Sequence, residues 1–159
     1  VRLMARAAEI WPATLRASAR HAELPLTITH GDVHLKNWYV TRDGRMGLSD
    51  WQVTSKGHWS RDVAYTISTA LTVDQRRAWE KDLLLYYLDA FTAAGGEPVP
   101  FEEAWLNYRQ QLLTTLAWWT MTLTPGDDLP DMQPRDITLN FIGRIATAID
   151  DLDALDSLR

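Results

Sequence analysis

The feature that most constrains the fold is a long apolar stripe in the second half of the chain. Large apolar side chains recur there every three or four residues, which is the period of an α-helix. They are Phe101, Trp105, Tyr108, Leu112, Leu116, Trp119 and Leu123. Pro100 stands at the start of the stripe, where proline suits the first turn of a helix. The stripe therefore predicts one long helix over residues 100–123 with a single buried face.

The rest of the chain changes character once, near residue 72. Before that point, short β-prone runs alternate with loops, and Asp43-Gly44 marks a tight turn between two of them. The expected strands are 26–29, 37–41 and 46–49, with a loop over 51–60. The expected helices are 2–19, 62–71, 74–94, 100–123 and 135–156. Asp62 is the predicted N-cap of the second helix, and Thr72 with Gln75 forms a capping box for the third.

The sequence therefore predicts a single domain over residues 1–159. Its fold class is mainly α with a small β-hairpin region, that is, α+β. Residues 26–71 hold the hairpin and its flanking loops, and residues 72–159 form a helical subdomain.

Composition excludes several classes of function. The formal net charge is −5, opposite in sign to that of proteins that wrap duplex nucleic acid. The absence of cysteine excludes disulfides, thiolate catalysis and cysteine-bound zinc. It also fits a reducing compartment. No apolar run approaches the roughly 18 residues of a membrane span, and no signal-peptide core precedes the first expected strand. We therefore expect a cytoplasmic protein with no nucleic-acid partner and no membrane span.

The densest polar cluster lies between the first two β-prone runs. It reads His30-Gly31-Asp32-Val33-His34-Leu35-Lys36-Asn37, and Asp50 follows where the hairpin returns. Because an antiparallel hairpin brings its two ends together, Asp32, Asn37 and Asp50 should meet at one mouth. The side-chain oxygens of Asn37 and Asp50 suit a hard cation such as Mg²⁺. Asp32 could orient a hydroxyl group and accept its proton.

The pattern His30-Gly31-Asp32, Asn37, hairpin, Asp50-Trp51-Gln52 resembles the C-terminal lobe of the aminoglycoside phosphotransferase and choline kinase-like family, which has a protein-kinase-like fold. With the run from Gly57 to Asp62, it looks most similar to the ecdysteroid kinase-like branch. The resemblance implies transfer of the γ-phosphoryl group of ATP to a hydroxyl of a small molecule, with ATP and Mg²⁺ as cofactors. It implies that Asp32 is catalytic, that Asn37 and Asp50 bind the metal, and that His30 and Asp62 support the loop.

A complete kinase of this type also has an N-terminal lobe with a glycine-rich loop and a phosphate-binding lysine. The glycines of the chain form no such loop, and Lys36, Lys56 and Lys81 lie in no matching strand. We therefore expect a C-lobe that lacks its N-lobe, which would lie upstream or on a separate chain. Half of the nucleotide site would then be missing from the chain alone, so its activity would depend on the absent lobe. Its uncovered apolar surface would favour self-association.

Two other functions stay open on the sequence. The chain could be a truncated or degenerate binding module without turnover. Alternatively, His30, Asp32 and His34 alternate as they would on one face of a strand, and could bind zinc in a metallohydrolase.

The substrate class also stays open. His34, His58 and Trp118 are candidate substrate contacts. The many aromatic residues allow a bulky apolar alcohol, whereas Asp127, Asp128 and Asp131 allow a cationic acceptor, although a solvated acidic loop is the favoured interpretation. The acidic residues of the C-terminal tail are interpreted as a solvated helix face. They are Asp150, Asp151, Asp153 and Asp156.

Overall fold

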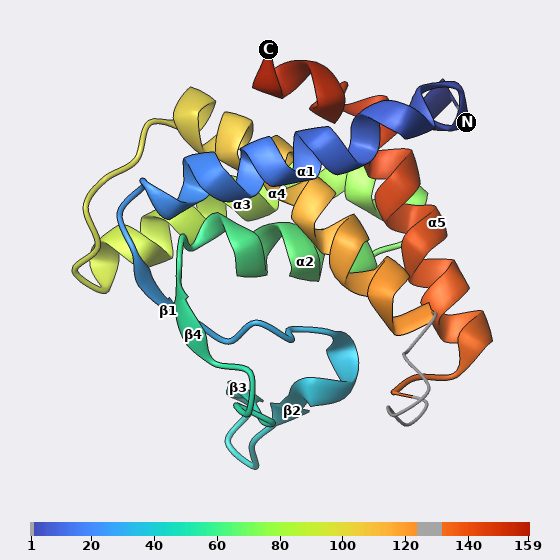
Figure 1. Ribbon diagram of the computed structural model, residues 1–159. Helices are drawn as coiled ribbons and strands as arrows, with labels where there is room; N and C mark the ends of the chain where they lie inside the picture. Colours follow the sequence, from blue (N-terminus) through green and yellow to red (C-terminus); the bar gives the residue numbers. More distant parts are fainter. Residues whose placement is uncertain (1, 124–131) are drawn as a thin grey trace.

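The computed structural model describes residues 2–123 and 132–159 and places a layer of helices over a small β region (Figure 1). The helices are α1 (Ala7–Ala22), α2 (Ser60–Ala70), α3 (Val73–Ala93), α4 (Phe101–Leu123) and α5 (Arg135–Asp151). Short 3₁₀ turns cover Arg2–Arg6, Leu35–Asn37 and Ala154–Leu158. The strands are β1 (Thr27–Thr29), β2 (Trp38–Val40), β3 (Met46–Leu48) and β4 (Ser55–Gly57). The predicted fold class, mainly helical with small antiparallel sheets, is confirmed.

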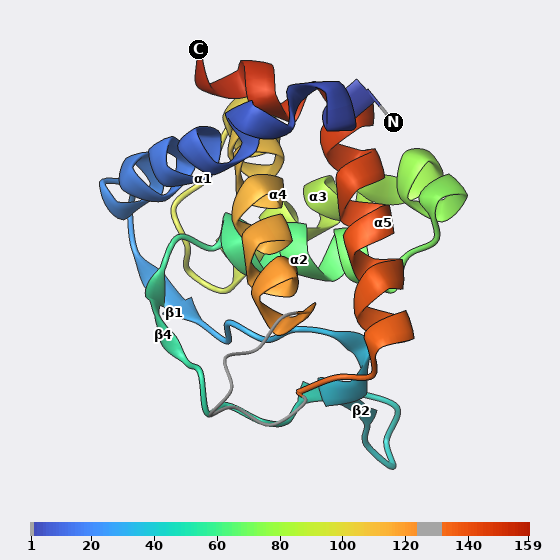
Figure 2. The same cartoon turned by 45° about the vertical axis from the view of Figure 1, so that its right-hand side comes forward.

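Helix α4 is the centre of the helical layer, because α1, α2 and α5 all pack against it. Figure 2 shows α4 between α1 and α5. The predicted apolar stripe forms its buried face, with Tyr108 and Leu112 wholly inaccessible and Trp119 only 1% exposed. None of the described helices combines the length and apolar character that a membrane crossing requires.

The strands form two separate antiparallel pairs. Strands β2 and β3 make the expected hairpin, with Trp38 opposite Leu48. Strand β1 pairs with β4, with Thr29 opposite Ser55, so the prediction of a loop over the whole of 51–60 is wrong. The sequence Ser55-Lys56-Gly57 has little intrinsic β-propensity. It becomes a strand because β1, distant in sequence, supplies the hydrogen-bonding partner.

Three helix ends refine the predicted boundaries. Helix α2 begins at Ser60, so Asp62 lies in the first turn and is not the N-cap. The capping box is confirmed, because Thr72 accepts from the Gln75 N–H while the Gln75 side chain accepts from the Thr72 N–H. The last predicted helix is broken after α5, where Asp153 adopts a left-handed backbone with φ of 46°.

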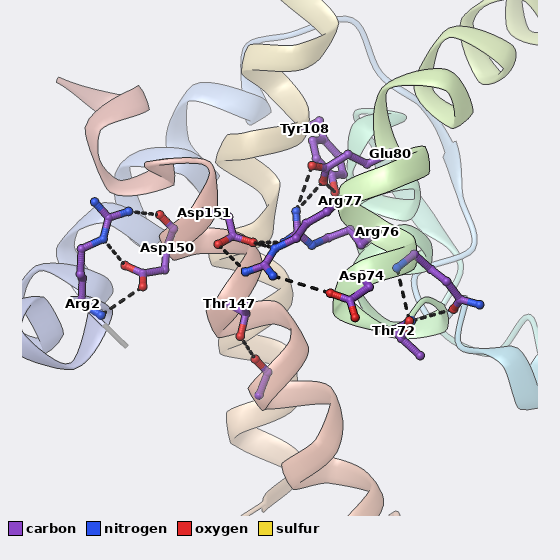
Figure 3. Close-up of polar contacts among 12 residues, drawn as sticks. Arg2, Thr72, Asp74, Arg76, Arg77, Glu80, Tyr108, Thr147, Asp150 and Asp151 are labelled. Carbon is purple, nitrogen blue, oxygen red and sulfur yellow. Dashed lines mark hydrogen bonds and ion pairs between the residues drawn. The ribbon is translucent and has the colours of Figure 1, made fainter.

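The interpretation of the acidic tail as a solvated face holds only in part, because Asp151 and Asp153 are exposed but arginines from elsewhere in the chain bind the tail. Figure 3 shows Asp151 of α5 facing Arg76 and Arg77, which both reach it from α3. Arg76 is 2% exposed and also donates to both Glu80 oxygens at 2.9 Å. Tyr108 donates to Glu80 at 3.1 Å. These contacts make α3, α4 and α5 one connected polar network around a buried guanidinium.

The termini are joined in the same way. Asp150 accepts from the Arg2 backbone N–H at 3.0 Å, and Asp156 accepts from Arg6 at 2.9 Å. The acidic tail therefore holds the N-terminal turn against the end of α5.

The neighbouring carboxylates Asp150 and Asp151 offer a matched test of this network. We expect Asp151→Asn to lower the free energy of unfolding by about 3 kcal/mol, because it leaves the buried Arg76 short of a counter-charge. Asp150→Asn should cost under about 1 kcal/mol, because its partner Arg2 is 71% exposed. Urea unfolding of both variants measures the difference, and equal losses would contradict this account.

Candidate active site

The loop after β1 is fixed by a carboxylate of α2. The backbone N–H groups of His30 and Gly31 donate to the two oxygens of Asp62 at 2.7 and 3.1 Å. Gly31 has a φ of +85°, and a Cβ there would lie 2.8 Å from the Val53 carbonyl oxygen. Only glycine therefore fits this turn without strain. The Asp62 carboxylate thus satisfies two loop donors that would otherwise lack a partner.

The ring of His30 forms the inner support of the loop. It is 2% exposed, and its Nδ1 accepts from the Asp32 N–H at 3.2 Å. Because Nδ1 accepts, the ring proton lies on Nε2, which donates to the Ser49 carbonyl at 2.9 Å. The Trp51 ring packs with its centroid 4.6 Å from that of His30. One histidine therefore links the loop to the end of the hairpin.

Three side chains contact the carboxylate of Asp32. Tyr65 donates its hydroxyl to Oδ1 at 2.7 Å, Asn37 donates Nδ2 to Oδ2 at 3.3 Å, and His34 Nε2 lies 3.4 Å from Oδ2. Burial favours the neutral acid, but the contacts with His34, Tyr65 and Asn37 outweigh it and hold the pKa of Asp32 below its usual range. Asp32 is therefore an oriented, ionised carboxylate at neutral pH.

The hairpin brings Asn37 to the place where Asp50 leaves the sheet. The Asn37 carbonyl accepts from the Ser49 N–H at 2.8 Å, and Asp50 follows directly with a left-handed φ of 62°. Nδ2 of Asn37 donates to the Asp32 carbonyl at 2.8 Å, which fixes the amide orientation and leaves Oδ1 without a donor among the described residues. The Asp50 residue is exposed. An amide oxygen and a carboxylate at one mouth fit a hard cation such as Mg²⁺.

The zinc alternative is not supported by the geometry. Both ring nitrogens of His30 are occupied by Asp32 and Ser49, so His30 cannot join Asp32 and His34 around a metal. Within residues 2–123 and 132–159, no three His, Asp or Glu side chains are grouped to hold a metal ion. The alternation of the three residues therefore does not produce a metallohydrolase site.

A cavity of about 460 Å³ lies between α1, β4, α2 and α4, and we call it the α1–α4 cavity. Two predicted substrate contacts, His58 and Trp118, line it together with Tyr65, whose hydroxyl binds Asp32. Tyr65 therefore connects the cavity to the loop carboxylate. The third predicted contact, His34, is buried between Asp32 and the Trp119 ring and does not line this cavity. Asp127, Asp128 and Asp131 lie outside the described residues.

His58 is a buried, neutral wall of the cavity. It is 5% exposed, and its Nδ1 lies 2.7 Å from the Ser60 hydroxyl. Burial, with a smaller contribution from neighbouring His21, lowers the pKa of His58 to about 4. Next to it, Trp59 is 4% exposed and stacks on Tyr87 with centroids 5.2 Å apart, so Trp59 anchors this segment in the core.

Tyr65 is the site residue that sequence reasoning missed. It lies one turn after Asp62 on α2, so both side chains reach the same loop from the same helix face. Burial, together with its hydrogen bond to Asp32, raises the pKa of Tyr65 far above its usual range, so it stays a donor. The available signal was the spacing Asp62-x-x-Tyr65 at the start of an expected helix.

Comparison with known proteins adds one finding. The family model described as "Phosphotransferase enzyme family" (APH) matches residues 2–100. Neither the curated proteins nor the solved structures contain a match to this chain. The matched residues include the loop, the hairpin and helix α2, which are the elements that build the site.

The depressed pKa of His58 predicts a pH-dependent stability. Between pH 6.5 and about 4, His58 is neutral in the folded chain but protonated in the unfolded chain, so the folded state loses stability as pH falls. We expect a loss of about 2–3 kcal/mol from this group. His58→Asn should flatten the pH dependence of the urea midpoint over this range, and an unchanged slope would contradict the assignment.

Proposed function

The chain belongs to the phosphotransferase enzyme family, and we propose that it is the catalytic lobe of a kinase that phosphorylates a hydroxyl group of a small molecule. In this proposal residues 26–71 carry the catalytic segment and residues 72–159 the helical subdomain. The observation that carries the proposal is the ionised carboxylate of Asp32, held by three side chains and joined through Tyr65 to the α1–α4 cavity.

In the proposed reaction, Asp32 acts on the hydroxyl group of the acceptor. The acceptor oxygen forms a bond to the γ-phosphorus of ATP as the bond to the β–γ bridging oxygen breaks, and ADP leaves. Asp32 orients the hydroxyl and takes its proton. The geometry of Asp32 supports this role, because its carboxylate is ionised at neutral pH and fixed in orientation before the substrate arrives.

Asn37 and Asp50 are the proposed ligands of Mg²⁺, which neutralises phosphate charge when bound with ATP. The exposed Asp50 and the Oδ1 of Asn37, to which no described residue donates, support this assignment. His30 and Asp62 position the loop that carries Asp32, and neither is proposed to touch the substrate. A cytoplasmic location, where ATP is supplied, is part of the proposal.

We further propose that an N-lobe outside these residues completes the nucleotide site, because the sequence contains no glycine-rich loop. Tyr39, Val40 and Met46 expose apolar side chains on the hairpin, at 49%, 65% and 58%, which supports a covering lobe there. Without that lobe we expect this surface to favour self-association.

The same missing loop motivates a second candidate, a kinase-like module that binds its ligand without turnover. Calorimetry of Mg²⁺-dependent ATP binding separates the two candidates, using this chain and a longer form extended upstream where the gene encodes one. Binding by the longer form supports the kinase, and binding by neither supports the module.

Substitution of Asp32 tests the assigned chemistry. In the longer form extended upstream, which supplies the N-lobe, we expect Asp32→Asn to lower the rate of phosphoryl transfer from ATP to a panel of hydroxylated acceptors by about 10²–10⁴-fold. Asp43→Asn, in the exposed hairpin turn, is the matched control and should retain the wild-type rate. Phosphorus NMR of the products measures both, and undiminished transfer by Asp32→Asn would exclude this mechanism.

Tyr65 is a positioning residue, and its removal should move a pH profile as well as a rate. Loss of the hydroxyl in Tyr65→Phe removes a hydrogen bond that lowers the pKa of Asp32, so that pKa should rise. We expect kcat to fall about tenfold and the acid limb of the pH–rate profile to shift to higher pH. A lower kcat with an unmoved acid limb would assign Tyr65 to packing alone.

A further inference from the structure

The α1–α4 cavity has two chemically different walls. One wall comes from the short segment that runs from β4 into α2, and the other comes from the faces of α1 and α4. A cavity of about 460 Å³ is within the usual range for a small-molecule site. The difference between the walls therefore indicates which class of ligand the cavity binds.

The first wall is cationic. Lys56 and Arg61 both line the cavity, and they are the charged side chains among its described lining residues. The Arg61 guanidinium lies 5.9 Å from the centre of the Trp118 ring, which holds it against the cavity. Neither cation forms an ion pair with a carboxylate in the part of the chain that the structure describes. These two charges are thus available to a ligand, although the chain as a whole carries a net charge of −5.

His58 adds a hydrogen-bond donor to the same wall. The Ser60 backbone N–H donates to His58 Nδ1 at 3.4 Å, and the Ser60 hydroxyl lies 2.7 Å from the same atom. A backbone N–H can only donate, so Nδ1 is the acceptor and the ring proton is assigned to Nε2. Nε2–H is then left for the cavity that His58 lines. Lys56, His58 and Arg61 therefore all present donors.

The opposite wall combines large apolar and aromatic side chains with neutral polar ones, which are Thr14, Ser18, His21, Gln111, Thr114 and Thr115. Trp11 and Leu15 come from α1, and Trp118 and Met121 come from α4. Trp11, Leu15 and Met121 are 60%, 52% and 62% exposed, so a ligand that covered them would bury apolar surface now facing water. This wall suits a planar or aliphatic body, and flat aromatic bodies gain additional contact with the tryptophan rings.

We propose that the α1–α4 cavity takes an acceptor with an apolar or aromatic body that carries an anionic group such as a carboxylate. This inference rests on the proposed function, because it treats the cavity, which Tyr65 links to Asp32, as the acceptor site. Lys56, Arg61 and His58 bind the anionic group, and the α1 and α4 side chains bind the body. The acceptor hydroxyl lies toward Tyr65, whose own hydroxyl binds Asp32 at 2.7 Å.

The proposal disfavours cationic acceptors, the class that the acidic residues of the sequence had left open. An ammonium group in this cavity would meet two like charges and a donor, with no carboxylate from a described lining residue. Like-charge contacts of this kind act as specificity elements, because they penalise the wrong ligand.

The test measures binding rather than turnover, with three probes that differ only in charge. They are hydroxymethyl-naphthoate, the matching carboxamide and the matching aminomethyl compound. Quenching of tryptophan fluorescence and calorimetry, both without nucleotide, follow binding to the chain. We expect the carboxylate to bind about tenfold more tightly than the carboxamide, because charge-assisted hydrogen bonds are the stronger kind. The amine should bind more weakly than either, and high salt should reduce the preference.

Matched variants assign the preference to its residues. Lys56→Gln with Arg61→Gln should erase the preference for the carboxylate while leaving carboxamide binding within about twofold. The control pair Arg42→Gln with Lys81→Gln, two cations that do not line the cavity, should keep it. Trp11→Ala should weaken all three probes by a similar factor, because it removes apolar contact and no charge.

The outcomes separate this inference from the proposed function. Asp32→Asn should lower transfer by about 10²–10⁴-fold yet leave the binding order unchanged, since Asp32 is not among the anion-binding groups. Absence of ATP-dependent transfer in the longer form extended upstream, with the anion preference intact, would overturn the proposed function alone. The inference itself is overturned if no probe binds, if the amine binds as tightly as the carboxylate, or if the preference survives removal of Lys56 and Arg61.

Discussion

The carboxylate of Asp62 joins the helical layer to the loop after β1, and the rest of the site depends on that junction. It accepts from two successive backbone N–H groups, those of His30 and Gly31, at 2.7 and 3.1 Å. In a turn this buried, those donors would otherwise be desolvated without a partner, at a cost of about 1–3 kcal/mol each. Because the loop is tied to a helix, Asp32 is presented from a rigid scaffold although it lies in irregular backbone.

Helix α2 is the element that the loop and the cavity share. Asp62 holds the loop backbone, Tyr65 holds the Asp32 carboxylate, and Arg61 lines the cavity. All three lie within two turns of one helix, so the helical backbone sets their relative positions. Helix α2 is in turn packed on α4. At the C-terminal end of α2, the Thr69 carbonyl accepts from Arg144 of α5 at 2.6 Å.

The acidic C-terminal tail and the cationic cavity wall lie in different parts of the chain. The acidic C-terminal residues bind arginines of the N-terminal turn and of α3, as Asp151 does with Arg76 and Arg77. This neutralises the acidic tail within the helical layer (Figure 3). Lys56 and Arg61 stay near the cavity, distant in sequence from that tail. A chain with a net charge of −5 can therefore still present a cationic wall to a ligand.

Local patterns in the sequence determined the helices and the loop motif, because helical periodicity, capping residues and the Asp-Gly turn act over a few residues. For this reason the predictions of a helix ending at Leu123 and of a capping box at Thr72 were both confirmed. Tertiary structure alone decided that residues 55–57 form a strand, because their partner β1 lies far away in the sequence. It also decided that Tyr65 binds Asp32 and that Asp151 pairs with the buried Arg76. Such contacts form only when segments distant in sequence pack together. The spacing of residues within one segment does not predict them.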